Sequence, residues 1–412
     1  MIKTLVFCFC VLLCFTNVSA KNIFVGTGKQ FKTINEALKI AEDGDSIIVS
    51  AGIYKEGNIE ITKKITLAGI NYPILDGQKK FEIISVRSPY VTISGFKLIN
   101  SGVSSIVDVA GIKIYNTYKV VIKNNILLET FFGIYLQNSS KCEITGNSLK
   151  ATTKIEQNNG NGIHCWKSDS LLITNNKIEG HRDGMYFEFT TNTKVVNNIS
   201  EKNLRYGLHF MFSHNNRYIT NIFKSNGAGV AVMYSHHVTM TANKFLENWG
   251  DGAYGLLLKE ITDSHVDNNL FLKNTIAIYM EGATRIVMQS NVFKFNGWAM
   301  KIMASCMDVT VNKNNFLSNT FDVGTNGSVS LNDFKNNYWD KYEGYDINKD
   351  GIGDVPYRPV SLFATIIENN PPAMILFRSF MSTLLDKTEK VIPTLTPENL
   401  KDDYPLMKPL KL

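Results

Sequence analysis

Histidine and methionine side chains recur in the middle of the chain at a spacing that suits metal binding. They are His209, Met211, His214, Met233 and His236. Met211 and Met233 are 22 residues apart, and so are His214 and His236. Imidazole nitrogen and thioether sulfur together are ligands that suit Cu(I). The pattern therefore predicts a copper site.

The same residue types also favour a protein-docking surface. Methionine adapts to irregular partners, and a stripe of exposed methionine and aromatic side chains is typical of an interaction site. Tyr186 and Met280 would belong to such a surface. Metal binding and docking both remain open, and the two can coexist.

An acidic, glycine-containing segment near the C-terminus resembles a calcium loop. Its candidate ligands, at positions 1, 3, 5, 7 and 9, are Asp346, Asn348, Asp350, the carbonyl of Ile352, and Asp354. Gly351 stands at position 6, where such a loop needs a sharp turn. Tyr357 stands at position 12 in place of a bidentate glutamate, so we expect weak calcium binding. The alternative is a solvated turn.

Two other function classes can be weighed from composition and spacing. The formal net charge is only +6 over 412 residues, and no block of Lys and Arg stands out, so no nucleic-acid partner is expected. A glycosidase needs two carboxylates at a set separation. Asp183, Glu188, Glu260 and Glu281 do not recur as pairs at matched positions. A polysaccharide lyase or glycoside hydrolase is therefore the minor alternative, and we expect no catalytic residues.

The elements that carry these residues repeat. Small residues open successive apolar runs at steps of 22 to 29 residues: Gly111, Gly133, Gly162, Gly184, Gly207, Gly229, Gly255 and Ala277. An asparagine follows fourteen residues after each: Asn125, Asn147, Asn176, Asn198, Asn221, Asn243, Asn269 and Asn291. Apolar residues alternate within each unit in three runs too short for a helix. The pattern predicts an all-β protein, a right-handed parallel β-helix over residues 21–337, with an asparagine ladder at one corner.

The segment before the repeat reads as a secretory signal followed by a cap. Lys3, the apolar run 5–15 and a small-residue cleavage site that ends at Ala20 predict a signal peptide over residues 1–20. A lipoprotein signal at Cys14 is the alternative, although Leu13 does not suit it. Residues 31–38 predict a short helix that covers the first coil.

The segment after the repeat differs in composition. Residues 338–358 form the acidic loop, and residues 359–412 hold seven of the ten prolines. A helix is expected over 373–391. Its apolar face is made of Met374, Phe377, Met381, Leu384 and Leu385. Either this segment caps the open end of the solenoid, or it docks onto a partner.

Several stretches resemble the NosD family. In the coils they are 205–213 (RYGLHFMFS), 229–235 (GVAVMYS), 255–259 (GLLLK), 279–283 (YMEGA) and 296–298 (NGW); in the tail they are 356–362 (PYRPVSL), 395–398 (LTPE) and 405–407 (PLM). The tail stretches are the more specific, because β-helices in general lack them. The resemblance covers nearly the whole chain after the signal.

The resemblance implies a periplasmic accessory protein without enzymatic activity. It would work with an ABC-type transporter and a copper chaperone to mature the copper–sulfide centre of nitrous oxide reductase. The tail would dock onto the transporter's permease. Copper would be held weakly or transiently, because a protein that hands over a metal should not hold it tightly.

Overall fold

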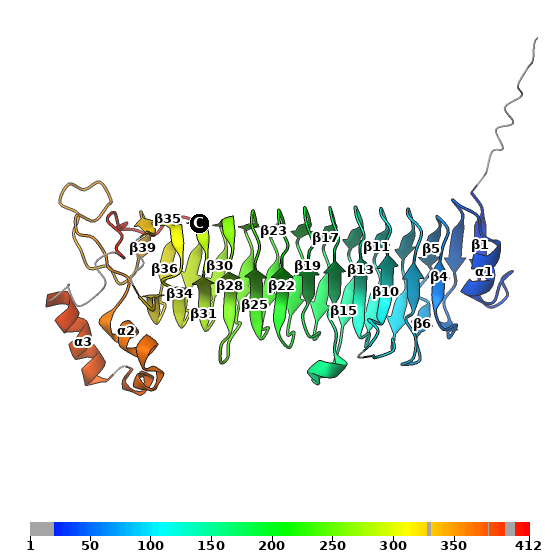
Figure 1. The fold of residues 1–412 in the computed structure, drawn as a ribbon, viewed down its shortest axis with the longest axis horizontal. Helices are drawn as coiled ribbons and strands as arrows, with labels where there is room; N and C mark the ends of the chain where they lie inside the picture. Colours follow the sequence, from blue (N-terminus) through cyan, green and yellow to red (C-terminus); the bar gives the residue numbers. More distant parts are fainter. Residues whose placement is uncertain (1–19, 105, 328–330, 378, 392–399) are drawn as a thin grey trace, which may run out of the picture.

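The computed structural model describes residues 20–412 apart from 105, 328–330, 378 and 392–399. The predicted signal peptide therefore lies, except for its last residue, outside the described residues. The chain winds into a long parallel β-solenoid whose coils stack along one axis (Figure 1). The predicted parallel β-solenoid is confirmed.

Each complete coil contributes one short strand to each of three parallel sheets. The first sheet has 14 strands: β1 (Asn22–Val25), β2 (Ser46–Val49), β5 (Thr66–Gly69), β8 (Thr92–Ser94), β11 (Val121–Lys123), β14 (Glu143–Thr145), β17 (Leu172–Thr174), β20 (Lys194–Val196), β23 (Arg217–Ile219), β26 (Thr239–Thr241), β29 (Thr262–Asp267), β32 (Thr284–Gln289), β35 (Met307–Asn312) and β38 (Asp333–Lys335). The second has 13: β3 (Ile53–Tyr54), β6 (Ile74–Asp76), β9 (Lys97–Ile99), β12 (Ile126–Leu128), β15 (Ser148–Lys150), β18 (Lys177–Glu179), β21 (Ile199–Glu201), β24 (Ile222–Lys224), β27 (Lys244–Leu246), β30 (Leu270–Leu272), β33 (Val292–Lys294), β36 (Asn315–Leu317) and β39 (Tyr338–Trp339). The third, called the site sheet below, has 12: β4 (Ile59–Ile61), β7 (Ile84–Val86), β10 (Ala110–Tyr115), β13 (Phe132–Gln137), β16 (Ile163–Trp166), β19 (Met185–Glu188), β22 (Tyr206–Met211), β25 (Ala228–Met233), β28 (Tyr254–Lys259), β31 (Ile276–Glu281), β34 (Trp298–Ile302) and β37 (Phe321–Gly324).

The core is a set of columns of like side chains that run along the axis. One column consists of the buried rings of Phe223, Phe245, Phe271, Phe293, Phe316 and Trp339. Neighbouring rings in it lie 3.9 to 5.6 Å apart, centroid to centroid, and stack at interplanar angles of 3° to 27°. The spacing of the strands sets this arrangement, because residues in register on parallel strands project the same way.

The predicted asparagine ladder is present and buried. The side-chain amide of Asn221 donates to Oδ1 of Asn243 over 3.0 Å, and the backbone N–H of Asn221 donates to the same oxygen over 2.9 Å. The pattern repeats from Asn125 to Asn291 and continues through Asn314 and Asn337. Each asparagine therefore fastens its own coil to the next one.

Both ends of the solenoid are covered. Helix α1 (Ile34–Ile40) begins with a capping box between Thr33 and Glu36 and buries Ile34 and Ala37 against the first coils. At the other end, Asp402 Oδ2 accepts hydrogen bonds from the backbone and side chain of Asn337 and from the indole of Trp339, each about 3.0 Å long. The C-terminal strand-like segment thus closes the asparagine ladder with a carboxylate.

The tail helices differ from the single helix that was expected. Helix α2 (Leu362–Asn369) comes first, then a 3-10 turn, η2 (Pro371–Leu376), and then α3 (Phe380–Val391). Phe377 has an extended backbone (φ −60°, ψ 133°), which ends η2 before α3 begins. The expected helix over 373–391 was therefore wrong at its start, because Pro371 and Pro372 open a 3-10 turn there instead.

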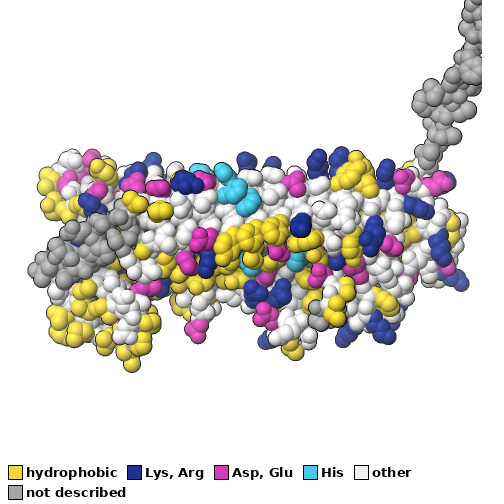
Figure 2. Space-filling view, viewed as in Figure 1, with side chains coloured by type: hydrophobic (Ala, Val, Ile, Leu, Met, Phe, Trp, Pro, Cys, Tyr) yellow, Lys and Arg dark blue, Asp and Glu magenta, His cyan; other side chains and the backbone are white. Residues whose placement is uncertain are grey.

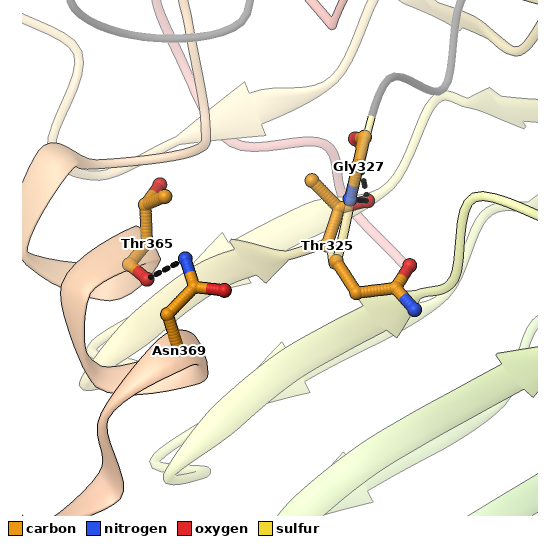
Figure 3. Close-up of a pocket in the computed structure, with 5 residues that line it drawn as sticks. Thr325, Gly327, Thr365 and Asn369 are labelled. Carbon is orange, nitrogen blue, oxygen red and sulfur yellow. Dashed lines mark hydrogen bonds between the residues drawn. The ribbon is translucent and has the colours of Figure 1, made fainter.

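Helix α2 packs sideways onto the outer face of the site sheet (Figure 1). Phe363 contacts Phe321 of β37, and Lys301 of β34 pairs with Glu368. Beside this contact lies a small polar crevice of about 160 Å³, lined by Thr325, Asn326, Gly327, Thr365 and Asn369. Its two walls bond within themselves (Figure 3), so the apolar contact and the Lys301–Glu368 ion pair attach the helix. None of the helices in the described part of the chain has the length and apolarity to cross a membrane.

Candidate functional site

Met211 and Met233 lie next to each other on the outer face of the site sheet. They end strands β22 and β25 and are in register. Both side chains are partly exposed. Adjacent parallel strands are about 4.8 Å apart, so the two thioethers come from neighbouring coils.

His214 and His236 follow in the next turn of the same two coils. Their rings stack 3.9 Å apart, centroid to centroid, at 11°. His236 Nδ1 lies 2.7 Å from His237 Nδ1, and the backbone N–H of His236 donates to His214 Nδ1 over 3.3 Å. Burial lowers the pKa of His214, and the neighbouring His236 and His237 lower it further. A lowered pKa keeps the His214 ring neutral, as a metal ligand must be.

An exposed aromatic column separates the methionines from the histidines. Phe189, Phe212 and Tyr234 stack at 5.3 and 5.0 Å with nearly parallel rings. The two central coils thus carry the same run, Met–aromatic–Ser–His, at 211–214 and 233–236. The serines are buried, and the Ser213 N–H donates to Ser235 Oγ over 3.0 Å. This contact holds the two runs in register.

We call this surface the double-coil patch. It consists of Met211, Phe212, His214, Met233, Tyr234, His236 and His237. On the face seen in Figure 2, an apolar band crosses the middle coils with histidine side chains beside it. Across the described ranges, no three His, Cys, Asp or Glu side chains are grouped so that they could hold a metal ion. A soft-metal site on this patch therefore needs the methionine sulfurs.

His209 projects to the outer face of the site sheet but does not belong to the exposed patch. It is only 5% exposed, because the rings of Tyr186 and Tyr206 lie 5.0 and 4.8 Å from its own. Its Nδ1 lies 3.8 Å from Oδ2 of the buried Asp183. The structure thus places His209 beneath the surface that carries the other four predicted copper ligands.

Of the two residues expected in a docking surface on the coils, only Tyr186 reaches the outer face. Met280 is fully buried. It lies on β31 with its side chain in the core, because residues alternate between the two faces of a strand. Its assignment to a docking surface was wrong. Tyr186, on β19, is partly exposed.

The calcium loop is not supported. Asp346 accepts N–H groups from Asp350 and Gly351, and Asp350 accepts the N–H of Ile352. The carboxylate of Asp354 accepts the N–H of Ile347, and Asn348 bonds to Asp350. These hydrogen bonds shape the loop, and the described residues include no group of three acidic or other ligand side chains there that could hold a metal ion. The residues around Ile352 bond to the C-terminal segment 405–407.

The tail presents most of its predicted apolar face to solvent. Met374, Phe377, Met381 and Leu384 are 37–49% exposed, whereas Leu385 packs against the α2 cluster. Ile375 and Phe380 are the most exposed, at 88% and 81%. Such a contiguous apolar surface is typical of an interaction site.

Together, the fold and the patch define a parallel β-solenoid protein that offers soft metal ligands on its middle coils. A family model described as "Periplasmic copper-binding protein (NosD)" matches residues 147–350. A relative from Pseudomonas aeruginosa, "Probable ABC transporter binding protein NosD", is 30% identical over 401 residues, which is 90% of this chain and 91% of the relative. A protein of the same description from Stutzerimonas stutzeri is 28% identical and covers 95% and 93%. The chain belongs to the NosD family.

Solved structures share the fold at low sequence identity. The catalytic unit of an α-1,3-glucanase from Streptomyces thermodiastaticus matches with a TM-score of 0.60 and 12% identity, covering 74% of this chain and 65% of that one. PfbA, a surface adhesin of Streptococcus pneumoniae, matches with a TM-score of 0.52 and 14% identity, covering 71% and 87%. At these identities the likeness shows the fold alone.

Proposed function

We propose that this chain is an exported periplasmic protein that binds copper, acts with an ABC transporter, and serves the maturation of the copper–sulfide centre of nitrous oxide reductase. The descriptions of its family and relatives support copper and the transporter. The observation that carries the copper part is the Met–aromatic–Ser–His run, repeated on two adjacent coils.

Copper is the cargo in this proposal. Met211 and Met233 supply soft sulfur, and His214 and His236 supply imidazole nitrogen. All four are partly exposed rather than enclosed, so a partner's ligands can reach the metal from outside. A copper chaperone would load this patch and nitrous oxide reductase would unload it.

The tail is the proposed contact with the permease. Its exposed apolar residues lie on η2 and α3, which extend beyond the solenoid (Figure 1). Burying Ile375 and Phe380 against a partner would remove them from water, which is the main driving force for such association. Carbohydrate chemistry remains the alternative function, and turnover of an oligosaccharide panel would support it instead.

Cu(I) affinity of the purified chain tests the copper part. Met211→Leu with Met233→Leu nearly conserves side-chain volume and removes both sulfurs. We expect Cu(I) affinity, measured by competition with a chromophoric chelator, to fall at least tenfold. Met374→Leu with Met381→Leu, at two exposed methionines of the tail, is the matched control and should leave affinity unchanged.

Maturation of the reductase in cells is the second measurement. The patch variant should yield reductase with a depleted copper–sulfide centre, although the chain is exported normally. If both Met→Leu pairs bind Cu(I) as the wild type does, the double-coil patch is not the metal site and the copper part of the proposal fails.

A further inference from the structure

One hydrogen bond connects the double-coil patch to the groups beneath it. Tyr186 Oη donates to Met211 Sδ over 3.5 Å. Tyr186 lies on β19, one coil before Met211, and is in register with His209 and not with Met211. The phenol therefore reaches diagonally across the sheet face to the sulfur.

The ring of Tyr186 is held on two sides. His164 lies 4.9 Å from it on the preceding coil, and His209 lies 5.0 Å from it on the following coil. His209 in turn contacts Tyr206 and lies next to the buried carboxylate of Asp183. These neighbours fix where the hydroxyl points.

The hydroxyl remains a donor throughout the physiological pH range. A phenol keeps its hydrogen near neutral pH, because its ordinary pKa is about 10. A thioether sulfur has two lone pairs. One can accept the phenolic hydrogen while the other remains free for a metal.

We propose that Tyr186 is a positioning residue that fixes the sulfur of Met211 for Cu(I), and that buried His209 supports Tyr186 instead of binding the metal. This inference rests on the proposed copper function. Methionine has three rotatable bonds, so an unrestrained thioether loses conformational entropy when it binds a metal. The hydrogen bond removes part of that loss in advance. Among the described residues Met233 Sδ has no such donor, so the effect belongs to Met211 alone.

A double-mutant cycle on the full mature chain tests this inference. Tyr186→Phe keeps the ring and removes the donor. We expect Cu(I) affinity to fall about 3- to 10-fold, which is the size of one hydrogen bond's net contribution. In the Met211→Leu background, Tyr186→Phe should have no further effect. Tyr279→Phe, on β31 of the same sheet and outside the double-coil patch, removes the hydroxyl of a partly exposed tyrosine and should leave affinity unchanged.

A second measurement does not need copper. The ¹³C-labelled methyl group of Met211 should show a single restricted environment in the wild type and faster averaging in Tyr186→Phe, while the methyl group of Met233 stays the same. The inference is overturned if the Tyr186→Phe variant binds Cu(I) as tightly as the wild type. It is also overturned if Tyr186→Phe weakens binding by the same factor in the Met211→Leu background as in the wild type. If the Met211→Leu, Met233→Leu pair also binds normally, the copper function itself fails, which is a different result.

Discussion

Burial separates the histidines of this chain into two groups with different chemistry. His214 and His236 lie partly exposed on the double-coil patch, whereas His181 is fully buried and His164 is packed among the rings of Phe132, Tyr135 and Tyr186. Burial lowers the pKa of His164 to about 3 and that of His181 to about 4. The rings of His164 and His181 therefore remain neutral at neutral pH and act as packing groups.

His181 should make the protein sensitive to acid. The unfolded chain takes up a proton at this residue near its ordinary pKa of about 6.5, whereas the folded chain does so only near pH 4. Between these values the unfolded state binds more protons, so the free energy of unfolding falls as the pH falls. On acidification, the free energy of unfolding of His181→Asn should therefore fall by roughly 3 kcal/mol less than that of the wild type.

Denaturant unfolding at pH 7 and pH 4.5 measures this difference. Asparagine suits position 181, because the backbone N–H of His181 already donates to Asn203 Oδ1, as the backbone of each ladder asparagine does. His265→Asn, at an exposed histidine on β29, is the control and should keep the wild-type pH dependence. Equal acid lability in His181→Asn would contradict the argument.

At the scale of elements, two asparagine ladders hold the coils together. The first was predicted from its spacing, and the second was not. The second runs through Asn203, Asn226, Asn248, Asn274, Asn296 and Asn319. All but the last follow an opening Gly184, Gly207, Gly229, Gly255 or Ala277 by nineteen residues. The signal was therefore present in the sequence and could have been counted in the same way.

Asn221→Leu should weaken the first ladder at its middle. Oδ1 of Asn221 accepts two N–H groups of Asn198, and its amide donates to Val195 O and Asn243 Oδ1. Leucine would leave these buried groups without partners. We expect the free energy of unfolding to fall by roughly 1–3 kcal/mol.

Equilibrium unfolding in guanidinium checks this value. Asn369→Leu is a suitable control, because that residue is exposed on α2 and its amide donates to Thr365 O within the same helix. It should change stability by less than 0.5 kcal/mol or so. A loss at Asn221 no larger than the loss at Asn369 would mean that the ladder contributes little.

Local spacing predicts strands and ladders well, because each coil repeats the same contacts. It predicts the site less well, because burial there depends on side chains from several coils. Alternation placed His209 on the outer face, but only the structure shows Tyr186 and Tyr206 around it. Met280 shows the opposite error: it was expected in a docking surface, although alternation along β31 puts its side chain in the core. The tail has no repeat, so its break at Phe377 had no periodic signal.

At the scale of the molecule, the tail has two parts with separate contacts. Residues around Asp402 close the asparagine ladder, and η2 with α3 presents the apolar surface. Cap and docking element are therefore not alternatives for one segment. Truncation after Arg358 would remove both, so it cannot separate their roles.

Point substitutions can separate the two parts. Ile375→Ser with Phe380→Ser should abolish co-purification with the permease and leave the melting temperature unchanged, because both side chains are almost fully exposed. Asp402→Ala should lower the free energy of unfolding by roughly 3 kcal/mol, because it strands buried donors of Asn337 and Trp339.

Co-purification and thermal melting are measured for both variants. Together they show whether η2 with α3 contacts the permease and whether Asp402 stabilises the solenoid. Lys401→Ala, next to the buried carboxylate but exposed, is the control for the second variant. Normal co-purification of the Ile375, Phe380 variant would show that the permease contacts another surface.

Because the coils stack at a fixed spacing, the number of coils sets the distance between the double-coil patch and the tail. Four strand steps of the site sheet separate β25, with the double-coil patch, from β37, where α2 is attached. At about 4.8 Å per step this is about 19 Å along the axis. Loss of residues 255–276, one whole coil, would bring the patch one step closer to the tail while leaving both surfaces intact. The axial distance between a docked transporter and a bound metal would thus be a whole number of coil spacings. Insertions and deletions during evolution could change it only by one coil at a time.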